Sequence, residues 1–166
     1  MKTLNIVFIC TANICRSPMA EGILKKRWSE FVGSSNTPSI GINVTSMGIY
    51  GLENQPSSEY SVQICMEKNI DISTHKSRPL IFDELASADI IFTMERVQRK
   101  HLHLLMPPFR EKIHLLGAWP EKETFKSNIK DPIGRRFRVY KNVCNKISLH
   151  VDRIIPHLNA LASKTL

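Results

Sequence analysis

The chain has 166 residues, 42% of them hydrophobic and 23% charged, which is typical of one globular domain. No apolar stretch approaches the roughly 20 residues of a membrane-spanning helix, and the first one is too short for a signal peptide. The net charge of +8 suits an anionic ligand, but no nucleic-acid-binding motif accompanies it. We therefore expect a single cytoplasmic domain over residues 1–166, with no nucleic-acid partner and no membrane insertion.

The first element is an apolar run from Leu4 to Ile9, which predicts a buried strand. The run stops at Cys10, and a short loop of small and polar residues follows. Arg-Ser-Pro at 16–18 then begins a helical pattern over 18–31. Pro18 fits the first turn of a helix, where its missing N–H costs nothing. The order is therefore strand, cysteine, five residues, Arg-Ser, helix.

The loop between this strand and helix has the chemistry of an anion site. Backbone N–H groups that lead into a helix N-terminus bind anions together with the helix dipole. Arg16 can offer two parallel donors to two phosphate oxygens. These positive surroundings favour the thiolate of Cys10, and Ser17 is placed to donate a hydrogen bond to its sulfur. A buried structural cysteine beside a surface arginine is the alternative, but the ordered combination of residues favours a nucleophile in an anion cradle.

The rest of the chain alternates between strands and helices. The patterns predict a loop over 33–38, a strand over 40–46, helices over 58–69 and 79–85, a strand over 89–94, a helix over 95–105, a strand over 112–116, a long loop over 117–134 and a helix over 136–162. Pro156 should kink or shorten that last helix. The alternation predicts an α/β fold, a doubly wound parallel sheet with helices on both faces and ligands beyond the carboxyl ends of its strands.

The loop sequence resembles a known signature. The segment Cys-Thr-Ala-Asn-Ile-Cys-Arg-Ser-Pro-Met-Ala-Glu at 10–21 is similar to the phosphate-binding motif of the low-molecular-weight protein tyrosine phosphatases, and it lies at the N-terminus as theirs does. The resemblance implies a four-stranded sheet in the order 2-1-3-4, no cofactor, and a phosphotyrosine-containing protein or peptide as partner. It implies that Cys10 and Arg16 are catalytic and that the phosphate-binding loop comprises Thr11, Ala12, Asn13, Ile14, Cys15 and Ser17.

Thiolate attack on a phosphate ester also needs an acid that protonates the leaving oxygen. Asp131-Pro132 lies in the loop after the last predicted strand, on the ligand side of the sheet. The resembled family places its general acid in an Asp-Pro pair here, which implies that Asp131 is catalytic; an ordinary Asp-Pro turn is the alternative. The implied reaction passes through a phosphocysteine intermediate and needs no metal.

The resemblance implies further positions around the loop. Asn13 should adopt an unusual backbone conformation supported by Ser46 and His75, although His75 could equally be a surface loop histidine. The family carries aromatic residues on two rim loops. Here the substrate rim would consist of Tyr50 or Leu52 on one side and of Ile133 on the other, so we expect a rim poor in aromatic side chains.

The four cysteines are Cys10, Cys15, Cys65 and Cys144, and none belongs to a C-x-x-C pair, which argues against a zinc site. In the resembled family a second loop cysteine can form a reversible disulfide with the nucleophile. Cys15 could act in this way, or it could be a small residue packed under the loop. Cys65 and Cys144 lie in apolar helical patterns and are expected in the core.

Three other functions remain to be weighed. An arsenate reductase of the same fold needs two further cysteines close in sequence, and Cys65 and Cys144 are far apart. In the phosphoarginine phosphatases of the family a threonine replaces Ile14, so isoleucine favours phosphotyrosine. A non-catalytic phosphate-binding module would have no need to keep a nucleophile and an acid. The sequence leaves the oligomeric state open.

Overall fold

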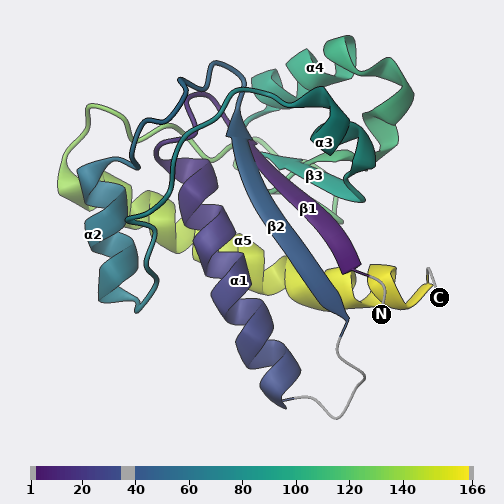
Figure 1. Cartoon of the computed structure of the whole chain (residues 1–166), viewed down its shortest axis with the longest axis horizontal. Helices are drawn as coiled ribbons and strands as arrows, with labels where there is room; N and C mark the ends of the chain where they lie inside the picture. Colours follow the sequence, from purple (N-terminus) through teal and green to yellow (C-terminus); the bar gives the residue numbers. More distant parts are fainter. Residues whose placement is uncertain (1–2, 35–39, 165–166) are drawn as a thin grey trace.

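Four parallel strands form one sheet in the order 2-1-3-4, as predicted. The computed structural model describes residues 3–34 and 40–164. The strands are β1 (Thr3–Cys10), β2 (Gly41–Gly48), β3 (Ile90–Thr93) and β4 (Ile113–Leu115). Figure 1 shows β1 in the middle of the molecule, with β2 and β3 on either side.

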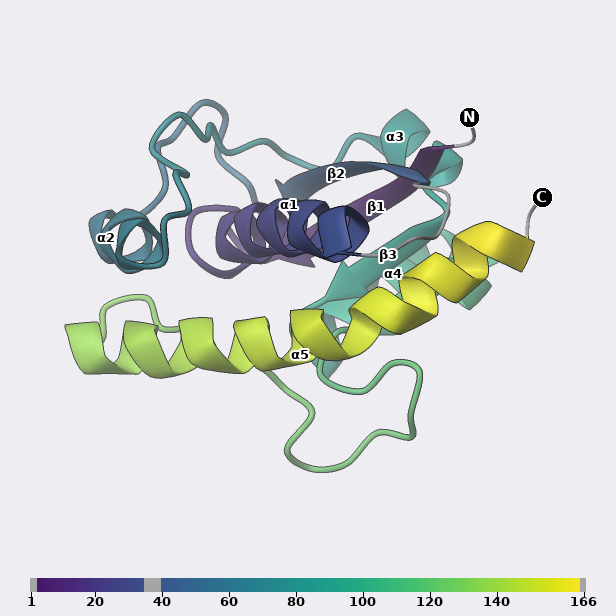
Figure 2. The ribbon, with the colours of Figure 1, turned by 90° about the horizontal axis from the view of Figure 1, so that it is seen from below.

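Helices cover both faces of the sheet. They are α1 (Arg16–Ser34), α2 (Glu59–Glu67), α3 (Phe82–Ser87), α4 (Arg96–Leu105) and α5 (Phe137–Lys164), with a 3-10 helix, η1 (Pro107–Lys112), before β4. Figure 2 shows α1 and α5 side by side on one face of the sheet. Residues of α3 and α4 pack on the other face. None of the helices in the described part of the chain combines the length and apolar character needed to cross a membrane.

Strand β1 is buried on both faces, which explains its almost continuous apolar sequence. Because side chains alternate along a strand, Ile6 and Phe8 join the cluster under α1 and α5, whereas Val7 and Ile9 join the cluster under α3 and α4. Strand β1 therefore packs in both halves of the core, and this packing fixes the position of Cys10 at its end.

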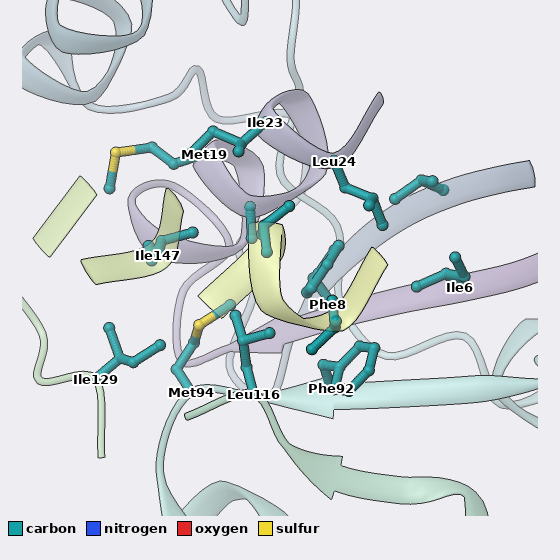
Figure 3. Close-up of a cluster of buried hydrophobic side chains, with 14 of the residues drawn as sticks. Ile6, Phe8, Met19, Ile23, Leu24, Phe92, Met94, Leu116, Ile129 and Ile147 are labelled. Atoms are coloured by element: carbon teal, nitrogen blue, oxygen red, sulfur yellow. The ribbon is translucent and has the colours of Figure 1, made fainter. Parts of the chain in front are cut away.

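The larger half of the core lies between the sheet and the pair α1 and α5 (Figure 3). Phe8 of β1 stacks on Phe92 of β3 with ring centroids 5.7 Å apart. Met19 and Ile23 of α1 and Ile147 of α5 belong to the same buried cluster as this stack (Figure 3). Burial of these side chains is what holds α1, and so the loop before it, against the sheet.

Several boundaries differ from the sequence prediction. The short helix expected from Pro79 begins at Phe82, because Pro79 pairs with Gly48 as a single β-bridge. Pro156 does not shorten α5, which continues to Lys164; Figure 2 shows the helix changing direction along its length. The helix η1 was not expected. Of the loop expected over 33–38, the first two residues belong to α1 and residues 35–38 lie outside the described part.

The carboxyl ends of the strands meet at one edge of the sheet, because all the strands are parallel. Cys10 is the last residue of β1 and Gly48 the last of β2, and Met94 and Glu95 follow β3 directly. The loop after β4 returns to the same edge, where Ile129 N donates a hydrogen bond to Met94 O. Segments from four parts of the sequence thus converge beside Cys10.

Candidate active site

The loop over residues 10–17, here called the Cys10 loop, folds around the sulfur of Cys10. The Cys10 Sγ lies 3.0 Å from Ser17 Oγ, and Asn13 N donates to the sulfur at 3.3 Å. Cys10 is buried at 2% exposure. Both hydrogen bonds stabilise a thiolate more than a thiol, because donors interact more strongly with an ionised acceptor.

Arg16, in the first turn of α1, is fully buried and is surrounded by acceptors. Its Nη1 donates to Glu95 Oε1 at 2.5 Å and to Ile129 O at 2.8 Å. Its Nη2 lies 3.1 Å from Asp131 Oδ2 and 3.4 Å from Thr11 Oγ1. The Nε is buried and has no hydrogen-bond partner among the described residues. A buried cation of this kind is stable only where carboxylates and carbonyls surround it.

Asp131 is brought to the Cys10 loop by the long segment after β4. Its Oδ2 pairs with Arg16, and its Oδ1 accepts a hydrogen bond from Ile133 N at 3.1 Å, in the turn that Pro132 begins. The carboxylate remains one-third exposed, so water and a substrate can reach it. The nucleophile, the arginine and the acid named from the sequence therefore lie together in one place.

Asn13 has a positive φ of 58°, a conformation that Asn tolerates better than most residues. Its Nδ2 donates to Ser17 Oγ at 2.8 Å and to Ser46 Oγ at 2.9 Å. Its Oδ1 accepts from Arg78 N at 3.0 Å, and its carbonyl lies 2.8 Å from His75 Nε2. These contacts hold the left-handed turn in place, and with it the direction of the loop N–H groups.

Four residues in this network were not identified from the sequence. Glu21 Oε2 accepts from Ser46 Oγ at 2.6 Å, and Arg78 donates its backbone N–H to Asn13. Glu95 pairs with Arg16, and Gln98 Nε2 donates to Thr11 Oγ1 at 3.1 Å. The position of Glu95 directly after β3 was the available signal, since polar residues at the carboxyl ends of parallel strands often form sites. Glu21 is the last residue of the signature segment at 10–21, whereas Arg78 and Gln98 have no comparable signal.

The rim around the site carries three exposed apolar side chains, Tyr50 (71%), Leu52 (66%) and Ile133 (51%). Tyr50 N donates to Thr11 O at 2.8 Å, which attaches the loop that follows β2 to the Cys10 loop. The Tyr50 ring lies 6.2 Å from the ring of His101, a residue to which the sequence gave no role. Tyr50 is the aromatic member of this trio.

All four cysteines are free thiols and buried. Cys15 Sγ donates to Ser58 Oγ at 3.3 Å and lies 3.7 Å from the Tyr140 hydroxyl. Burial raises the pKa of the Cys15 thiol, and burial raises the pKa of Tyr140 to about 12. Cys65 and Cys144 share a hydrogen bond in the core, which together with burial raises the pKa of Cys65. Within residues 3–34 and 40–164, no group of three or more His, Cys, Asp or Glu side chains is arranged to hold a metal ion.

Comparison with known proteins gives one consistent result. Residues 5–164 match the model of the family described as low molecular weight phosphotyrosine protein phosphatase. A low molecular weight protein-tyrosine-phosphatase from Acinetobacter johnsonii is 35% identical over 133 residues, which cover 80% of this chain and 82% of the relative. A protein-arginine-phosphatase from Bacillus subtilis is 26% identical, over 87% of this chain and 89% of the relative. The crystal structure of a low molecular weight protein tyrosine phosphatase from T. tengcongensis superimposes with a TM-score of 0.82 at 29% identity, covering 93% of this chain and 99% of that one.

Proposed function

Because the chain belongs to the low molecular weight phosphotyrosine protein phosphatase family and is a cysteine-based hydrolase of phosphorylated proteins, we propose that it hydrolyses phosphotyrosine monoesters with Cys10 as nucleophile, Arg16 as phosphate ligand and Asp131 as general acid. Thr11, Ala12, Asn13, Ile14, Cys15 and Ser17 form the rest of the phosphate cradle.

One observation supports this assignment above the others. Arg16 is buried, yet its Nε has no partner among the described residues. Within the described part of the chain, its Nη2 donates to Thr11, at 3.4 Å, and to Asp131. Nε and Nη2 form one edge of a guanidinium, the edge that binds two oxygens of a phosphate in parallel. A phosphoryl group beside Cys10 would satisfy the free Nε and bring phosphorus to the sulfur.

In the first step the Cys10 thiolate attacks phosphorus in line with the leaving group, so that an S–P bond forms as the P–O bond to the phenol breaks. Arg16 and the N–H groups of the Cys10 loop hold the equatorial oxygens, whose charge grows in the transition state. Asp131 gives its proton to the phenolic oxygen as it departs.

In the second step water attacks the phosphocysteine. Asp131, now a carboxylate, takes a proton from the water as its oxygen bonds to phosphorus. The S–P bond breaks, inorganic phosphate leaves and Cys10 returns as a thiolate. Ser17 and Asn13 stabilise this leaving group through the same hydrogen bonds that they make to the sulfur in the resting enzyme.

The preference for phosphotyrosine rests on Ile14 and on the rim. Ile14 is half-buried and packs against the main core, so it gives the loop an apolar wall where the phosphoarginine enzymes of the family have threonine. Tyr50 can pack against a phenyl ring. We also place the enzyme in the cytoplasm, because a free nucleophilic thiol with a second thiol five residues away persists in a reducing compartment.

The test is hydrolysis of p-nitrophenyl phosphate and of matched phosphotyrosine and phosphoarginine peptides, with chelator present. We expect turnover that vanadate blocks and a higher kcat/KM for phosphotyrosine. Cys10→Ser should abolish turnover and keep phosphate binding. Asp131→Ala should slow phenyl phosphate more than p-nitrophenyl phosphate, because a poor leaving group depends more on its proton. Full activity of Cys10→Ser, or equal losses for both esters, would refute the assigned roles.

A further inference from the structure

A hollow of about 690 Å³ lies between α5 and the segment that leads from β4 to Asp131. Residues from the range 117–130 form one wall, and residues of α5 from the range 139–150 form the other. Figure 2 shows this segment extending beside α5. None of the lining residues belongs to the Cys10 loop or to the rim. The hollow is here called the lysine groove, after Lys126, Lys130 and Lys146, which line it.

The lysine groove carries positive charge that the protein does not neutralise. Among the residues that the structure describes, no carboxylate lines the groove, and none of its three lysines forms an ion pair. Glu123 of the same segment pairs instead with two arginines of α4. The groove therefore favours a ligand that carries carboxylates or other anionic groups.

Lys146 joins the two walls of the groove. Its Nζ, on α5, donates to Lys126 O and to Asn128 O, both at 2.7 Å, so the groove exists before a ligand binds. An ammonium group has three protons, and these two bonds leave one for a ligand. Burial, and to a smaller extent the charge of Lys130, lowers the pKa of Lys146. An anion in the groove would relieve this repulsion between the two lysines.

Exposed apolar side chains lie on both walls of the groove. Phe125 is 83% exposed and Leu149 is 67% exposed. The Nζ of Lys126 lies 5.4 Å from the centre of the Phe125 ring, so cation and ring form one mixed surface. Apolar and aromatic side chains that stay exposed beside charges are typical of protein-binding surfaces. The fitting partner is therefore a peptide that offers both carboxylates and an apolar side chain.

The segment that forms one wall of the groove also borders the active site. Lys130 lines the groove and is followed directly by Asp131, which pairs with Arg16. Ile129, one residue earlier, accepts a hydrogen bond from Arg16 through its carbonyl at 2.8 Å. A substrate chain whose phosphotyrosine lies at Cys10 can therefore follow this segment into the groove. About three to six extended residues would span roughly 10–20 Å.

Resting on the proposed function, we propose that the lysine groove binds an acidic segment of the phosphoprotein substrate, a few residues away from the phosphotyrosine. Carboxylates of this segment pair with Lys126 and Lys130 and accept the remaining proton of Lys146. An apolar side chain of the segment packs between Phe125 and Leu149. The enzyme thus selects phosphotyrosine that lies near an acidic stretch.

The experiment compares phosphotyrosine peptides that are identical except for one segment, Glu-Glu-Leu-Glu or Gln-Gln-Leu-Gln, placed about three to six residues before or after the phosphotyrosine. The measured quantity, here called the glutamate ratio, is kcat/KM of the glutamate peptide divided by that of the glutamine peptide. On one side of the phosphotyrosine it should be roughly ten, the effect of two exposed ion pairs at about three-fold each. It should approach one in about 1 M salt, where charges are screened within about 3 Å.

Two lysine variants test where the acidic segment binds. Lys126→Gln should lower the glutamate ratio about three-fold, because one ion pair is lost. Lys122→Gln is the matched control: it removes an exposed lysine of the same segment that does not line the groove, and it changes the net charge equally. It should leave the glutamate ratio unchanged.

Phe125→Ala tests the apolar contact. It should lower kcat/KM of the glutamate peptide without lowering Tm, because the ring is largely exposed. Replacing the leucine of the peptide by serine should remove the difference between Phe125→Ala and wild type, since the ring then has no apolar partner.

Several results would overturn the proposal: a glutamate ratio near one on both sides of the phosphotyrosine, a ratio that persists in about 1 M salt, or equal effects of Lys122→Gln and Lys126→Gln. A wild type that sediments as a dimer and a Phe125→Ala variant that sediments as a monomer would place a second copy of the chain in the groove instead.

The two proposals fail separately. If wild type hydrolyses p-nitrophenyl phosphate but its glutamate ratio is near one, the groove proposal alone fails. If it hydrolyses neither ester nor peptide, the proposed function fails. Fluorescence anisotropy of an unphosphorylated, fluorescein-labelled glutamate peptide then still tests the groove, and equal binding to wild type and to Lys126→Gln would refute it.

Discussion

The ion pair between Arg16 and Glu95 should govern both stability and catalysis. Glu95 Oε1 lies 2.5 Å from Nη1 of the buried Arg16, and the other acceptors of this guanidinium are Ile129 O, Thr11 Oγ1 and Asp131. Glu95→Gln keeps the shape and one acceptor oxygen but removes the charge. The hydrogen bond that remains still involves the charged guanidinium, so the change removes only the attraction between the two opposite charges, about 1 kcal/mol for a partly exposed pair.

Thermal unfolding measures this cost. For a domain of this size, 1 kcal/mol shifts Tm by about 2–4 °C, so Glu95→Gln should unfold roughly 2–4 °C below wild type. Glu95→Ala removes the acceptor as well. Breaking a buried pair costs about 3–5 kcal/mol, and because Glu95 is one-quarter exposed the lower end applies. That is a loss of about 6–12 °C in Tm.

Steady-state kinetics test the catalytic half of the argument. If Arg16 loses its orientation, kcat/KM for p-nitrophenyl phosphate should fall roughly tenfold in Glu95→Ala, equivalent to about 1.4 kcal/mol of transition-state stabilisation. Glu30→Gln is the control, since Glu30 is exposed and pairs with Arg27 at the far end of α1. If both Glu95 variants melt and turn over like wild type, Glu95 does not position Arg16.

Three other predictions follow from the same region and from α5. In Gly48→Ala the new Cβ would lie 2.8 Å from Thr11 O, so the Cys10 loop must shift. Calorimetry should therefore show weaker phosphate binding, and an unchanged affinity would contradict the close packing of Gly48 on the loop. Burial raises the pKa of Cys15, so iodoacetamide at pH 7 should label Cys10 before Cys15, and bound phosphate should protect Cys10. Mass spectrometry measures the two labelling rates, and faster labelling of Cys15 would refute the prediction. Burial, with a smaller effect of two neighbouring cations, lowers the pKa of His150 to about 4 from 6.5. The unfolded state then binds the extra proton, so the free energy of unfolding should fall as the pH is lowered from about 6.5 to 4. Urea titrations should show a smaller fall over that range for His150→Gln, and an equal fall in both proteins would contradict the lowered pKa.

The sequence predicted the Cys10 loop well because its chemistry is local. Cys10, Asn13, Arg16 and Ser17 lie within eight consecutive residues between a strand and a helix, so their mutual geometry follows from the turn that joins the two. Asp131 was identified from an Asp-Pro pair and its place after the last strand. The strand order 2-1-3-4, implied by the resemblance, is confirmed. Strand β1, which is buried along almost its whole length, lies inside the sheet.

The sequence did not predict the long-range contacts of the site. Arg78 N lies 65 positions from its acceptor on Asn13, and Glu95 lies 79 positions from Arg16. Neither residue belongs to a motif. Glu95 reaches the loop because parallel strands place their carboxyl ends at one edge, and Arg78 reaches it because Gly48 at the end of β2 donates to Arg78 O at 3.0 Å and forms a bridge with Pro79. The same holds for the helix boundary at Pro79, where a bridge to β2 outweighed local preference.

The sequence by itself determined the chemistry of this protein, a thiol nucleophile in an anion cradle, because adjacent residues on a strand–loop–helix unit are sufficient to build it. Only the tertiary structure decided what surrounds that chemistry. The acceptors that hold Arg16 come from segments that meet only when the sheet forms, and so do the contacts that maintain Asn13 in its left-handed conformation. The physical reason is that buried polar groups need partners in three dimensions, and the chain supplies them from wherever folding brings them close.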